Sequence, residues 1–411
     1  MAIPGTAVPG PGGVVQTQGQ VRRANLAAVL DRLRADGPRS RARLATETGL
    51  TKATVSSLVG ELVERGLAAE GELQRPGSVG RPGMLVELDG RGVCGLGVEV
   101  NVDYLAVLAL DPTGAVRWQS RLALDVPALD PADVLARASA MVAEAQADQD
   151  ATAVGITVAV PGQVQGTVVA AAPNLPRWVG VDVAAGFAAW ELPVTVANDA
   201  DLSALAETAV GPHAGVPDLV YLTGEVGVGG GVVTGGRLLR GSTGLAGEVG
   251  HLALTPGDAP CGCGRTGCWE TVVGLAALLR AAADPGDPLR DAGRDLEDRL
   301  AELLARARAG DARTLAALAD IGTGLGVGAA VLVALLDPAV VVLGGYFAVL
   351  GEFLLEPLTA ALAQRVPGPS RVALSTLGFT AAVRGGAHVA LQPVFSDPTT
   401  VPVRTAQEAH A

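Results

Sequence analysis

The residues from Gly247 to Thr271 decide how the rest of the chain is interpreted. They read Gly247-Glu-Val-Gly-His251, then nine residues, then Cys261-Gly-Cys263-Gly-Arg-Thr-Gly-Cys268-Trp-Glu270-Thr271. Three of the chain's four cysteines therefore fall within eight residues, just downstream of a histidine. Thiolates and imidazole suit the tetrahedral preference of Zn2+, and four protein ligands leave no open position for catalysis. The spacing predicts one structural zinc ion per chain, held by His251, Cys261, Cys263 and Cys268.

The alternative is a set of buried or disulfide-bonded cysteines. Cys261 and Cys263 are too close in sequence to pair comfortably, and nothing else marks a secreted protein. The zinc interpretation is therefore favoured.

Length and composition indicate an α/β protein with two or three domains. The chain has 411 residues, of which 49% are apolar and only 3% aromatic. Its start lacks the charged region and apolar run of a signal peptide, and residues 325–336 form a glycine-broken apolar stretch too short to cross a bilayer. We therefore expect a cytoplasmic protein without a membrane partner.

Charge is unevenly distributed along the chain. The formal net charge is −12, yet residues 1–90 hold eleven Lys/Arg against nine Asp/Glu, which leaves −14 for the remainder. A near-neutral, arginine-rich segment ahead of a strongly acidic body indicates two parts with different tasks.

The first 90 residues carry the pattern of a helix-turn-helix. Residues 1–20 are expected to be disordered because they largely lack periodicity. Apolar residues at helical spacing then predict a first helix ending at Gly37, a second capped by Ser40, and a third from Lys52 to about residue 65. The second and third meet at Gly49-Leu50-Thr51, so the third helix would enter the major groove.

Two further strands, at residues 67–72 and 84–88, are predicted to form a wing. The Gly80-Arg81-Pro82 tip between them suits insertion into a narrow minor groove. We therefore predict a winged helix-turn-helix over residues 21–90 that binds double-stranded operator DNA, rather than a three-helix bundle with an exposed hairpin. One such head reads half of an operator, so a homodimer or homotetramer is expected. The predicted DNA-contacting residues are Arg41, Lys52, Thr54, Ser56, Ser57 and Arg81.

Beyond residue 90 strands alternate with helices. Apolar runs predict strands at 93–100, 105–111, 116–124, 154–160, 194–197, 219–222, 232–234 and 340–345, and helices at 131–149, 296–308 and 311–335. Residues 227–231 are interpreted as a glycine turn, and residues 396–411 as a flexible tail. Two α/β units facing one another across a cleft are the natural interpretation.

The motifs of this body resemble those of the ROK family (repressor, open reading frame, kinase). The matching stretches are Asn198-Asp199-Ala with Ala206-Glu207, Gly241-x-x-Gly-x-Ala-Gly-Glu248-x-Gly-His251, and the cysteine loop ending in Glu270. The resemblance implies the actin/hexokinase-like (ribonuclease H-like) fold, with one domain at 91–200 and 375–395 and a second, zinc-bearing domain at 201–374. A winged helix-turn-helix ahead of such a body resembles the repressor branch of the family, which senses sugars or sugar derivatives.

A sugar-binding cleft needs carboxylates and amides that bond to several hydroxyls at once. His251 can give one ring nitrogen to zinc and present the other to the ligand. Taken alone, Asp199 can equally be the N-cap of the helix that follows it. The resemblance implies that the sugar-contacting positions are Asn174, Asn198, Asp199, Glu248, His251 and Glu270.

Whether the body is a kinase depends on its phosphate loops. In ROK kinases an aspartate at the position of Asp199 is the catalytic base, which keeps phosphorylation of a hexose by ATP as an alternative. Those kinases carry Asp-x-Gly-Gly-Thr where this chain has Glu99-Val-Asn-Val-Asp103, and their second loop is altered here by Glu225 and Val226. A carboxylate about 4 Å from a phosphate charge costs on the order of 4 kcal/mol at an effective dielectric near 20. We therefore predict a sugar-responsive regulator without enzymatic activity, in which Asp199 is a vestigial base. A repressor controlled by a protein partner is the third hypothesis.

Overall fold

The computed structural model describes residues 17–73, 84–242, 244–255, 259–291, 293–368 and 371–404. The chain divides into two compact units, one formed by Met1–Gly92 with Gln392–Ala411 and the other by Val93–Leu391. The chain therefore crosses from one unit to the other after Gly92 and again at residues 391 and 392. The predicted wing tip with Arg81, and residues 1–16 of the predicted disordered segment, lie outside the described residues.

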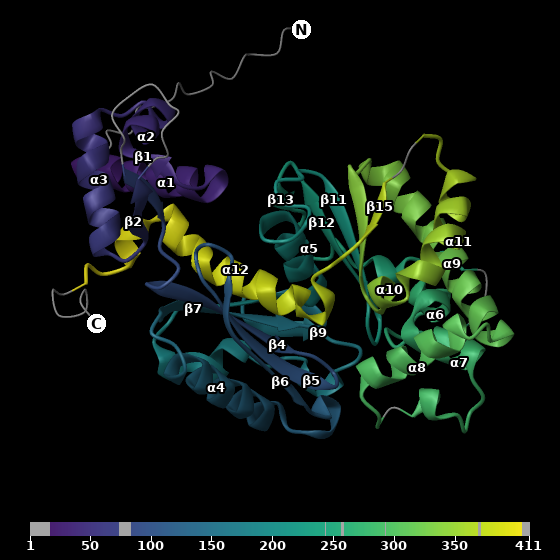
Figure 1. The fold of residues 1–411 in the computed structure, drawn as a ribbon. Coiled ribbons are helices and arrows are strands. Elements are labelled where there is room, and N and C mark those ends of the chain that lie inside the picture. The colour runs from purple at the N-terminus through teal and green to yellow at the C-terminus, as the bar shows by residue number, and fades with distance from the viewer. Residues whose placement is uncertain are drawn as a thin grey trace, which may run out of the picture. The chain divides into compact units, whose positions relative to one another are not determined.

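The first unit contains the predicted winged helix-turn-helix. Ser40 and Thr51 cap the second and third helices through their side chains, and Gly49 has the left-handed φ of 71° that the turn between them requires. Three strands pair in the order β1-β3-β2 beside the helices. The elements of this head (Figure 1) are α1 (Gln18–Asp36), β1 (Arg39–Ser40), α2 (Arg41–Thr48), α3 (Lys52–Glu64), β2 (Ala68–Leu73) and β3 (Met84–Leu88).

The predicted flexible tail is wrong as far as Arg404. After α12 (Ala381–Ser396) the chain forms a short 3-10 helix, Pro398–Thr400, and Val401 is only 6% exposed. The backbone N–H of Arg404 donates to the carbonyl of Glu64 at 2.8 Å, and the Arg65 guanidinium donates to the carbonyl of Val401. These contacts between residues more than 300 apart are invisible to a local pattern, which shows only a polar, proline-containing end.

The first sheet of the second unit has the order β10-β7-β4-β5-β6. Its strands are β4 (Val93–Val100), β5 (Tyr104–Leu110), β6 (Val116–Ala123), β7 (Thr152–Val160) and β10 (Val194–Asn198), with β4, β7 and β10 parallel. Leu96 and Val98 of β4 join one apolar core with residues of α4 (Pro131–Ala147). The alternate residue Gly97 faces α12, since a Cβ there would lie 1.9 Å from the carbonyl oxygen of Val383. The sheet is therefore covered by α4 on one face and α12 on the other (Figure 1).

The second sheet repeats this plan in the order β13-β12-β11-β14-β15. Its strands are β11 (Leu219–Gly224), β12 (Val228–Thr234), β13 (Arg237–Leu238), β14 (Val340–Gly345) and β15 (Val372–Leu374). Helix α5 (Asp199–Ala209) packs on one face, and a helical layer packs on the other. That layer contains α6 (Glu270–Val273), α7 (Leu275–Ala282), α8 (Leu296–Arg308), α9 (Ala312–Leu336), α10 (Tyr346–Val349) and α11 (Gly351–Ala363). The two sheets confirm the predicted α/β body.

The glycine run at 227–231 is not the turn that was predicted. Gly229, Gly230 and Gly231 lie inside β12 and pair with β11. A Cβ on Gly231 would lie 2.4 Å from the carbonyl oxygen of Ala200, and one on Gly229 would lie 2.9 Å from the Cβ of Ala200. These glycines are needed because α5 packs closely on the strand, not because the chain reverses there.

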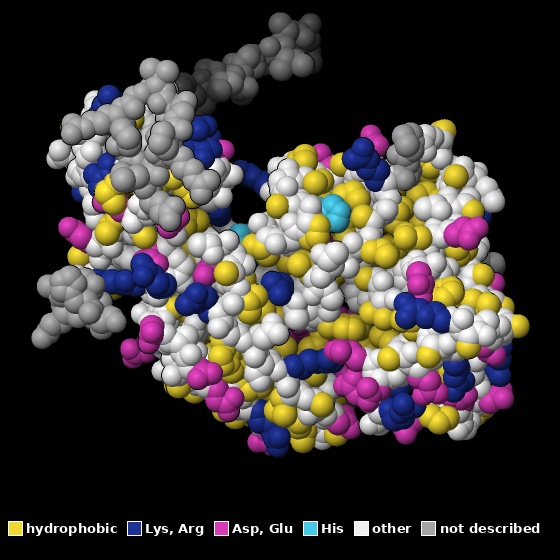
Figure 2. Space-filling view, viewed as in Figure 1, with side chains coloured by type: hydrophobic (Ala, Val, Ile, Leu, Met, Phe, Trp, Pro, Cys, Tyr) yellow, Lys and Arg dark blue, Asp and Glu magenta, His cyan; other side chains and the backbone are white. Residues whose placement is uncertain are grey.

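Helix α9 matches the helix predicted at residues 311–335 to within one residue, and it contains the apolar stretch at residues 325–336. It is the one described helix long and apolar enough, by length and composition, to cross a membrane. Leu318, Ile321 and Leu325 are nevertheless buried in the core on the second sheet, as in the central helix of a globular domain. Acidic and basic side chains lie side by side around α7 and α8 on the face drawn in Figure 2. Arg306 of α8 forms an ion pair with Asp287 at 2.7 Å.

Candidate functional site

A cavity of about 180 Å³ opens between the two sheets of the second unit. Residues that follow β4, β7 and β10 line it from the first sheet. The turn between β11 and β12, and the segment from Gly244 to His251, line it from the second. All six predicted sugar-contacting residues lie on its wall: Asn174, Asn198, Asp199, Glu248, His251 and Glu270.

Asn198 and Asp199 reach the cavity from the junction of β10 and α5. The side-chain oxygen of Asn198 accepts from the backbone N–H of Asp201 at 3.1 Å, and its amide donates to the carbonyl of Gly162 at 3.1 Å. Asn198 is therefore the N-cap of α5. The alternative interpretation of Asp199 as the cap is wrong, because Asp199 is the first helical residue and its Oδ1 accepts from Ala200 at 2.8 Å. Its carboxylate is left at the cavity wall.

Glu248, His251 and Glu270 approach from the second sheet. His251 ends a short 3-10 helix, Val249–His251, which turns its ring between the two glutamates. Its Nε2 lies 3.9 Å from Glu248 Oε2, and its Nδ1 lies 3.4 Å from Glu270 Oε1. Glu270 also accepts from the backbone N–H of Val228 at 3.4 Å, which ties the cysteine loop to the start of β12. The two ring nitrogens of His251 thus have different surroundings.

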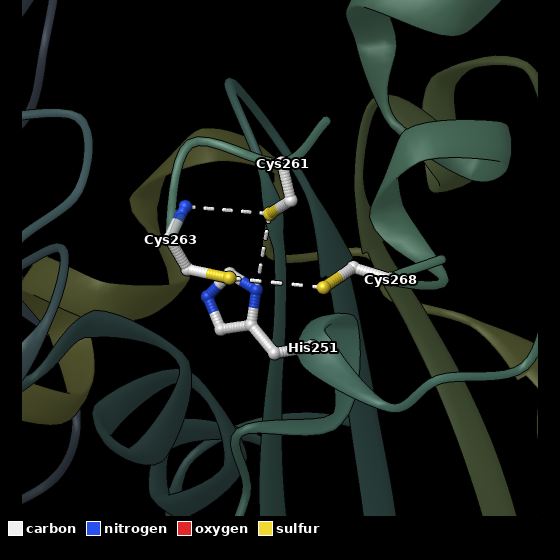
Figure 3. Close-up of side chains that lie close together, drawn as sticks. All are labelled: His251, Cys261, Cys263 and Cys268. Atoms are coloured by element: carbon white, nitrogen blue, oxygen red, sulfur yellow. Dashed lines mark hydrogen bonds between the residues drawn. The ribbon is translucent and has the colours of Figure 1, made fainter. Parts of the chain in front are cut away.

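The three loop cysteines and His251 form a compact group whose four ligand atoms lie within 4.8 Å of one another. Figure 3 shows the thiols and the imidazole converging from the loop and the 3-10 helix. Cys263 Sγ lies 3.7 Å from Cys268 Sγ, and Cys261 Sγ lies 3.5 Å from His251 Nδ1. Tetrahedral bonds of about 2.3 Å to sulfur and about 2.05 Å to nitrogen require separations of roughly 3.8 and 3.6 Å. The geometry therefore fits a structural metal ion.

The thiols are free, and one of them is already acidic. All four cysteines of the chain lack a disulfide, so the disulfide alternative is not supported. Burial raises the pKa of Cys263, but the Arg265 guanidinium donates to its sulfur at 3.4 Å, and together with other donors this lowers the pKa to about 6. A thiolate at neutral pH is the form that binds a metal.

The cavity wall is strongly acidic. Five carboxylates line it, whereas Arg240 is the only Lys or Arg among the described lining residues. Burial raises the pKa of Asp199 to about 6 and that of Asp201 to about 7, and burial also raises the pKa of Glu248. Such a wall accepts hydrogen bonds from hydroxyl groups and repels an anionic ligand. The acidic lining residues are Asp199, Asp201, Glu225, Glu248 and Glu270.

Comparison with known families agrees with this geometry. The ROK family model matches residues 95–392. The chain belongs to the ROK family. A second model, for the IclR helix-turn-helix domain, matches residues 24–71 and so covers the head. The chain therefore joins a helix-turn-helix domain to a ROK body.

Relatives of this ROK protein include both regulators and kinases. A putative xylose repressor from Caldicellulosiruptor sp. is 30% identical over 338 residues, covering 79% of this chain and 84% of the relative. A solved ROK family transcriptional regulator, described as a homologue of the E. coli MLC protein, has a TM-score of 0.74 at 26% identity and covers 92% of this chain and 97% of its own. A Streptomyces griseus ROK glucokinase, solved with glucose and AMPPNP, has a TM-score of 0.62 at 27% identity over 73% of this chain and 99% of its own.

The ROK body differs from the kinase pattern at the two segments that occupy the positions of the kinase phosphate loops. Asn101 and Glu225, one from each loop, lie 2.5 Å apart between amide nitrogen and carboxylate oxygen, and both line the cavity. Burial and the neighbouring carboxylates of Glu99 and Asp199 raise the pKa of Glu225 well above its usual value. Carboxylates and an amide thus stand together where the resemblance implies phosphate binding.

The predicted DNA-contacting residues differ in their exposure to solvent and in whether their side chains are hydrogen-bonded within the head. Lys52, Ser56 and Ser57 are exposed on α3, whereas the Thr54 hydroxyl is hydrogen-bonded to that of the cap residue Thr51 at 2.8 Å. Arg41 is bound internally, donating to Glu70 at 2.5 Å and to the carbonyl of Ser56 at 3.2 Å. Of the described candidates, Lys52 offers an exposed positive charge at the start of α3, and it is the chain's single lysine.

Three polar residues of the cavity wall were not predicted from the sequence as ligand-contacting residues. Gln163, Asp201 and Arg240 all line the wall, and Gln163 bonds to Glu248. Asp201 stands two positions after Asp199 at the start of α5, a signal that could have been used. Nothing in the local sequence of Gln163 or Arg240 points to the cavity, because their positions depend on how separate loops converge.

Proposed function

We propose that this ROK protein binds an unphosphorylated sugar in the cavity between its sheets and, in response, releases operator DNA from its helix-turn-helix head. A helix-turn-helix joined to a ROK body, with xylose repressors among its relatives, supports a sugar-responsive transcriptional repressor. The observation that carries the finer proposal is the cavity wall, where amides, an imidazole and carboxylates from both sheets converge. The protein would act in the cytoplasm, where operator DNA is.

An uncharged sugar fits this wall better than a sugar phosphate. Each hydroxyl can donate to one of the five carboxylates, and hydrogen bonds to charged groups contribute about 1.5–3 kcal/mol each. A phosphate group would meet the ionised carboxylates of this wall as like charges, with Arg240 alone to offset them among the described lining residues. We therefore place xylose and other neutral monosaccharides ahead of phosphorylated sugars.

Kinase activity is the second candidate, favoured by the glucokinase relatives and by Asp199. A buried carboxylate with a pKa of about 6 is chemically able to accept a proton from a sugar hydroxyl. The proposal against it rests on Asn101 and Glu225, which stand where the resemblance implies phosphate binding. ATP would have to displace this contact and approach Glu99 and Glu225 with its own negative charges.

We propose that the metal held by His251 and the three loop cysteines is Zn2+. Its role would be structural, because four protein ligands fill a tetrahedral shell. The ion would fix the loop that carries Glu270 and the ring of His251. In this way the metal keeps two sugar-contacting residues in place without contacting the sugar.

The proposed response to sugar is a population shift. A ligand that touches both walls binds the closed cleft more tightly, so it favours closure. Both chain crossings to the head leave from the first sheet and the helix that covers it, β4 after Gly92 and α12 at residue 391. A change in that sheet is therefore passed to the heads of a homodimer or homotetramer. Typical coupling of about 1–3 kcal/mol corresponds to roughly 5- to 150-fold weaker operator binding.

The test is a matched set of titrations on the purified protein. Calorimetric titrations with xylose, glucose, glucose 6-phosphate and ATP should show that a neutral sugar binds and that ATP does not bind. A gel-shift assay, on DNA selected from a random library by the ligand-free protein, should show that the same sugar weakens DNA binding. ATP binding with turnover of sugar to sugar phosphate would establish the kinase instead. Sugar-independent DNA binding would favour a protein partner as the signal.

A further inference from the structure

One hydrogen-bonded contact joins the two sheets beside the cavity. Asn101 directly follows β4 of the first sheet, and Glu225 directly follows β11 of the second. The amide nitrogen of Asn101 donates to Glu225 Oε2 at 2.5 Å and to Glu99 Oε1 at 3.2 Å. Its side-chain oxygen accepts from the backbone N–H of Val102 at 2.6 Å. One side-chain amide therefore serves two carboxylates from opposite walls and is itself fixed in orientation.

A series of side-chain contacts leads from Glu99 through the first sheet to a second contact between the first sheet and the helical layer of the second sheet. The Tyr104 hydroxyl donates to Glu99 Oε1 at 2.6 Å, and the Arg121 guanidinium lies 4.0 Å from the centroid of the Tyr104 ring. Arg121, on β6, forms an ion pair with Glu297 of α8, which belongs to the helical layer of the second sheet. A connected path thus runs from one wall through the sheet and back to the other.

The surroundings make the amide indispensable to this arrangement. Glu99 is 1% exposed, and its Oε2 has no hydrogen-bond partner among the described residues. Buried carboxyl groups that lack hydrogen-bond partners are costly, and Glu99 and Glu225 share the same amide as a donor. Asn101 supplies both bonds, so its loss would leave Glu99 and Glu225 without this donor and would remove the hydrogen bond that joins the two walls.

We propose that Asn101 and Glu225 form a clasp that holds the two sheets in the arrangement able to bind sugar. The inference rests on the proposed function, because it assigns a positioning role at the same cavity. A sugar that touches both walls needs them at a fixed separation, and the clasp sets that separation without any nucleotide. Loss of the clasp lowers the population of the binding-competent arrangement, and the apparent affinity falls by the same factor.

The experiment is a double-mutant cycle with Asn101→Ala, Glu225→Ala and the combined variant. Glu144→Ala is the matched control, because Glu144 is an exposed glutamate on α4 that does not line the cavity. In urea unfolding without ligand, Asn101→Ala should destabilise the parent clearly. It should destabilise the Glu225→Ala variant much less, because the hydrogen bond between Asn101 and Glu225 is already absent there. Asn101→Asp keeps the size but loses the amide donor, so at pH 8 it should be at least as harmful as alanine.

The second measurement is the sugar dissociation constant by calorimetry. Asn101→Ala and Glu225→Ala should each weaken sugar binding at least fivefold, and the combined variant no more than the worse single one. Glu144→Ala should weaken it less than twofold. Metal content and circular dichroism should match the parent. Additive effects in either measurement, or parental sugar affinity in the single variants, would overturn the clasp while leaving the proposed function standing. A parent protein that binds no sugar refutes the proposed function itself, and the ligand-free unfolding cycle then still decides whether the contact exists.

Discussion

Protonation of Asp199 should set the pH range over which this protein responds to sugar. Asp199 lies at the cavity wall, and burial, with a contribution from Glu248, raises its pKa to about 6. A sugar hydroxyl donates a much stronger hydrogen bond to the carboxylate than to the carboxylic acid. At pH 7.5 nearly all of the group is ionised, whereas at pH 5 about one tenth is. Sugar affinity should therefore fall about tenfold from pH 7.5 to pH 5.

The perturbation that isolates this effect is Asp199→Asn. At pH 7.5 the variant loses a hydrogen bond to a charged acceptor, about 1.5–3 kcal/mol, which predicts roughly 10- to 150-fold weaker sugar binding. Its affinity should also change much less with pH than that of the parent. Calorimetric titrations at pH 5, 6, 7 and 7.5 measure both quantities. Asp201→Asn is the control, because its carboxylate lines the same cavity and its pKa is raised to about 7, so this variant should keep the pH dependence that belongs to Asp199.

Lowering the pH should have the opposite effect on the stability of the ligand-free protein, because Asp199 then raises the free energy of unfolding while sugar affinity falls. A folded-state pKa of about 6 lies above the ordinary aspartate value of 3.8, so the folded protein binds this proton more tightly than the unfolded chain does. The stabilising contribution of Asp199 is therefore complete below pH 4 and is lost as the pH rises through 6. The unfolding free energy of the parent should thus gain on that of Asp199→Asn between pH 7.5 and pH 5. For sugar binding, an Asp199→Asn variant that kept the parent's full pH dependence of affinity would refute the assignment of Asp199 to the sugar site.

Three further predictions concern the metal, the DNA and the end of the chain. The parent should copurify with one Zn2+ per chain, and Cys263→Ser should lower both metal content and sugar affinity; elemental analysis showing no zinc in protein prepared without chelators would contradict the assignment. Lys52→Ala should weaken DNA binding and reduce the slope of log affinity against log salt concentration by about one. DNA should also protect this single lysine from amine labelling, and equal labelling with and without DNA would show that Lys52 is not in the interface. Ending the chain at residue 396 removes the buried Val401 and the carbonyl that accepts from Arg65. Thermal unfolding should then show a helix-turn-helix head that is less stable by about 1–3 kcal/mol, and an unchanged unfolding transition of the head would mean that these contacts do not stabilise it.

Much of the fold was predictable because its signals are local. Caps at Ser40 and Thr51, the glycine between them, and apolar residues at helical spacing are enough to define a helix-turn-helix. Helix α8 and strand β14 have the predicted bounds for the same reason. The Cys-x-Cys spacing likewise predicted a metal-capable group, since three of its four ligands come from one eight-residue loop.

The errors arose where the determining contact comes from a distant part of the chain. The glycines of β12 resemble a turn in sequence, but they are required by the approach of α5. Residues 396–404 resemble a loose tail, but they complete the head through Arg65 and the backbone of Glu64. In both cases a local pattern contains no information about the partner surface.

The sequence by itself determined the residue types of the site, and the tertiary structure decided what those residues do to one another. Carboxylates at Asp199, Glu248 and Glu270 follow from the motifs. Their gathering around one cavity, and the raised pKa values of the first two, follow from the tertiary structure and from burial there. Asn101 and Glu225 are 124 positions apart and meet only because β4 and β11 end beside the same cavity. Electrostatic energies depend on distance and dielectric, and both are set by the folded arrangement of separate strands.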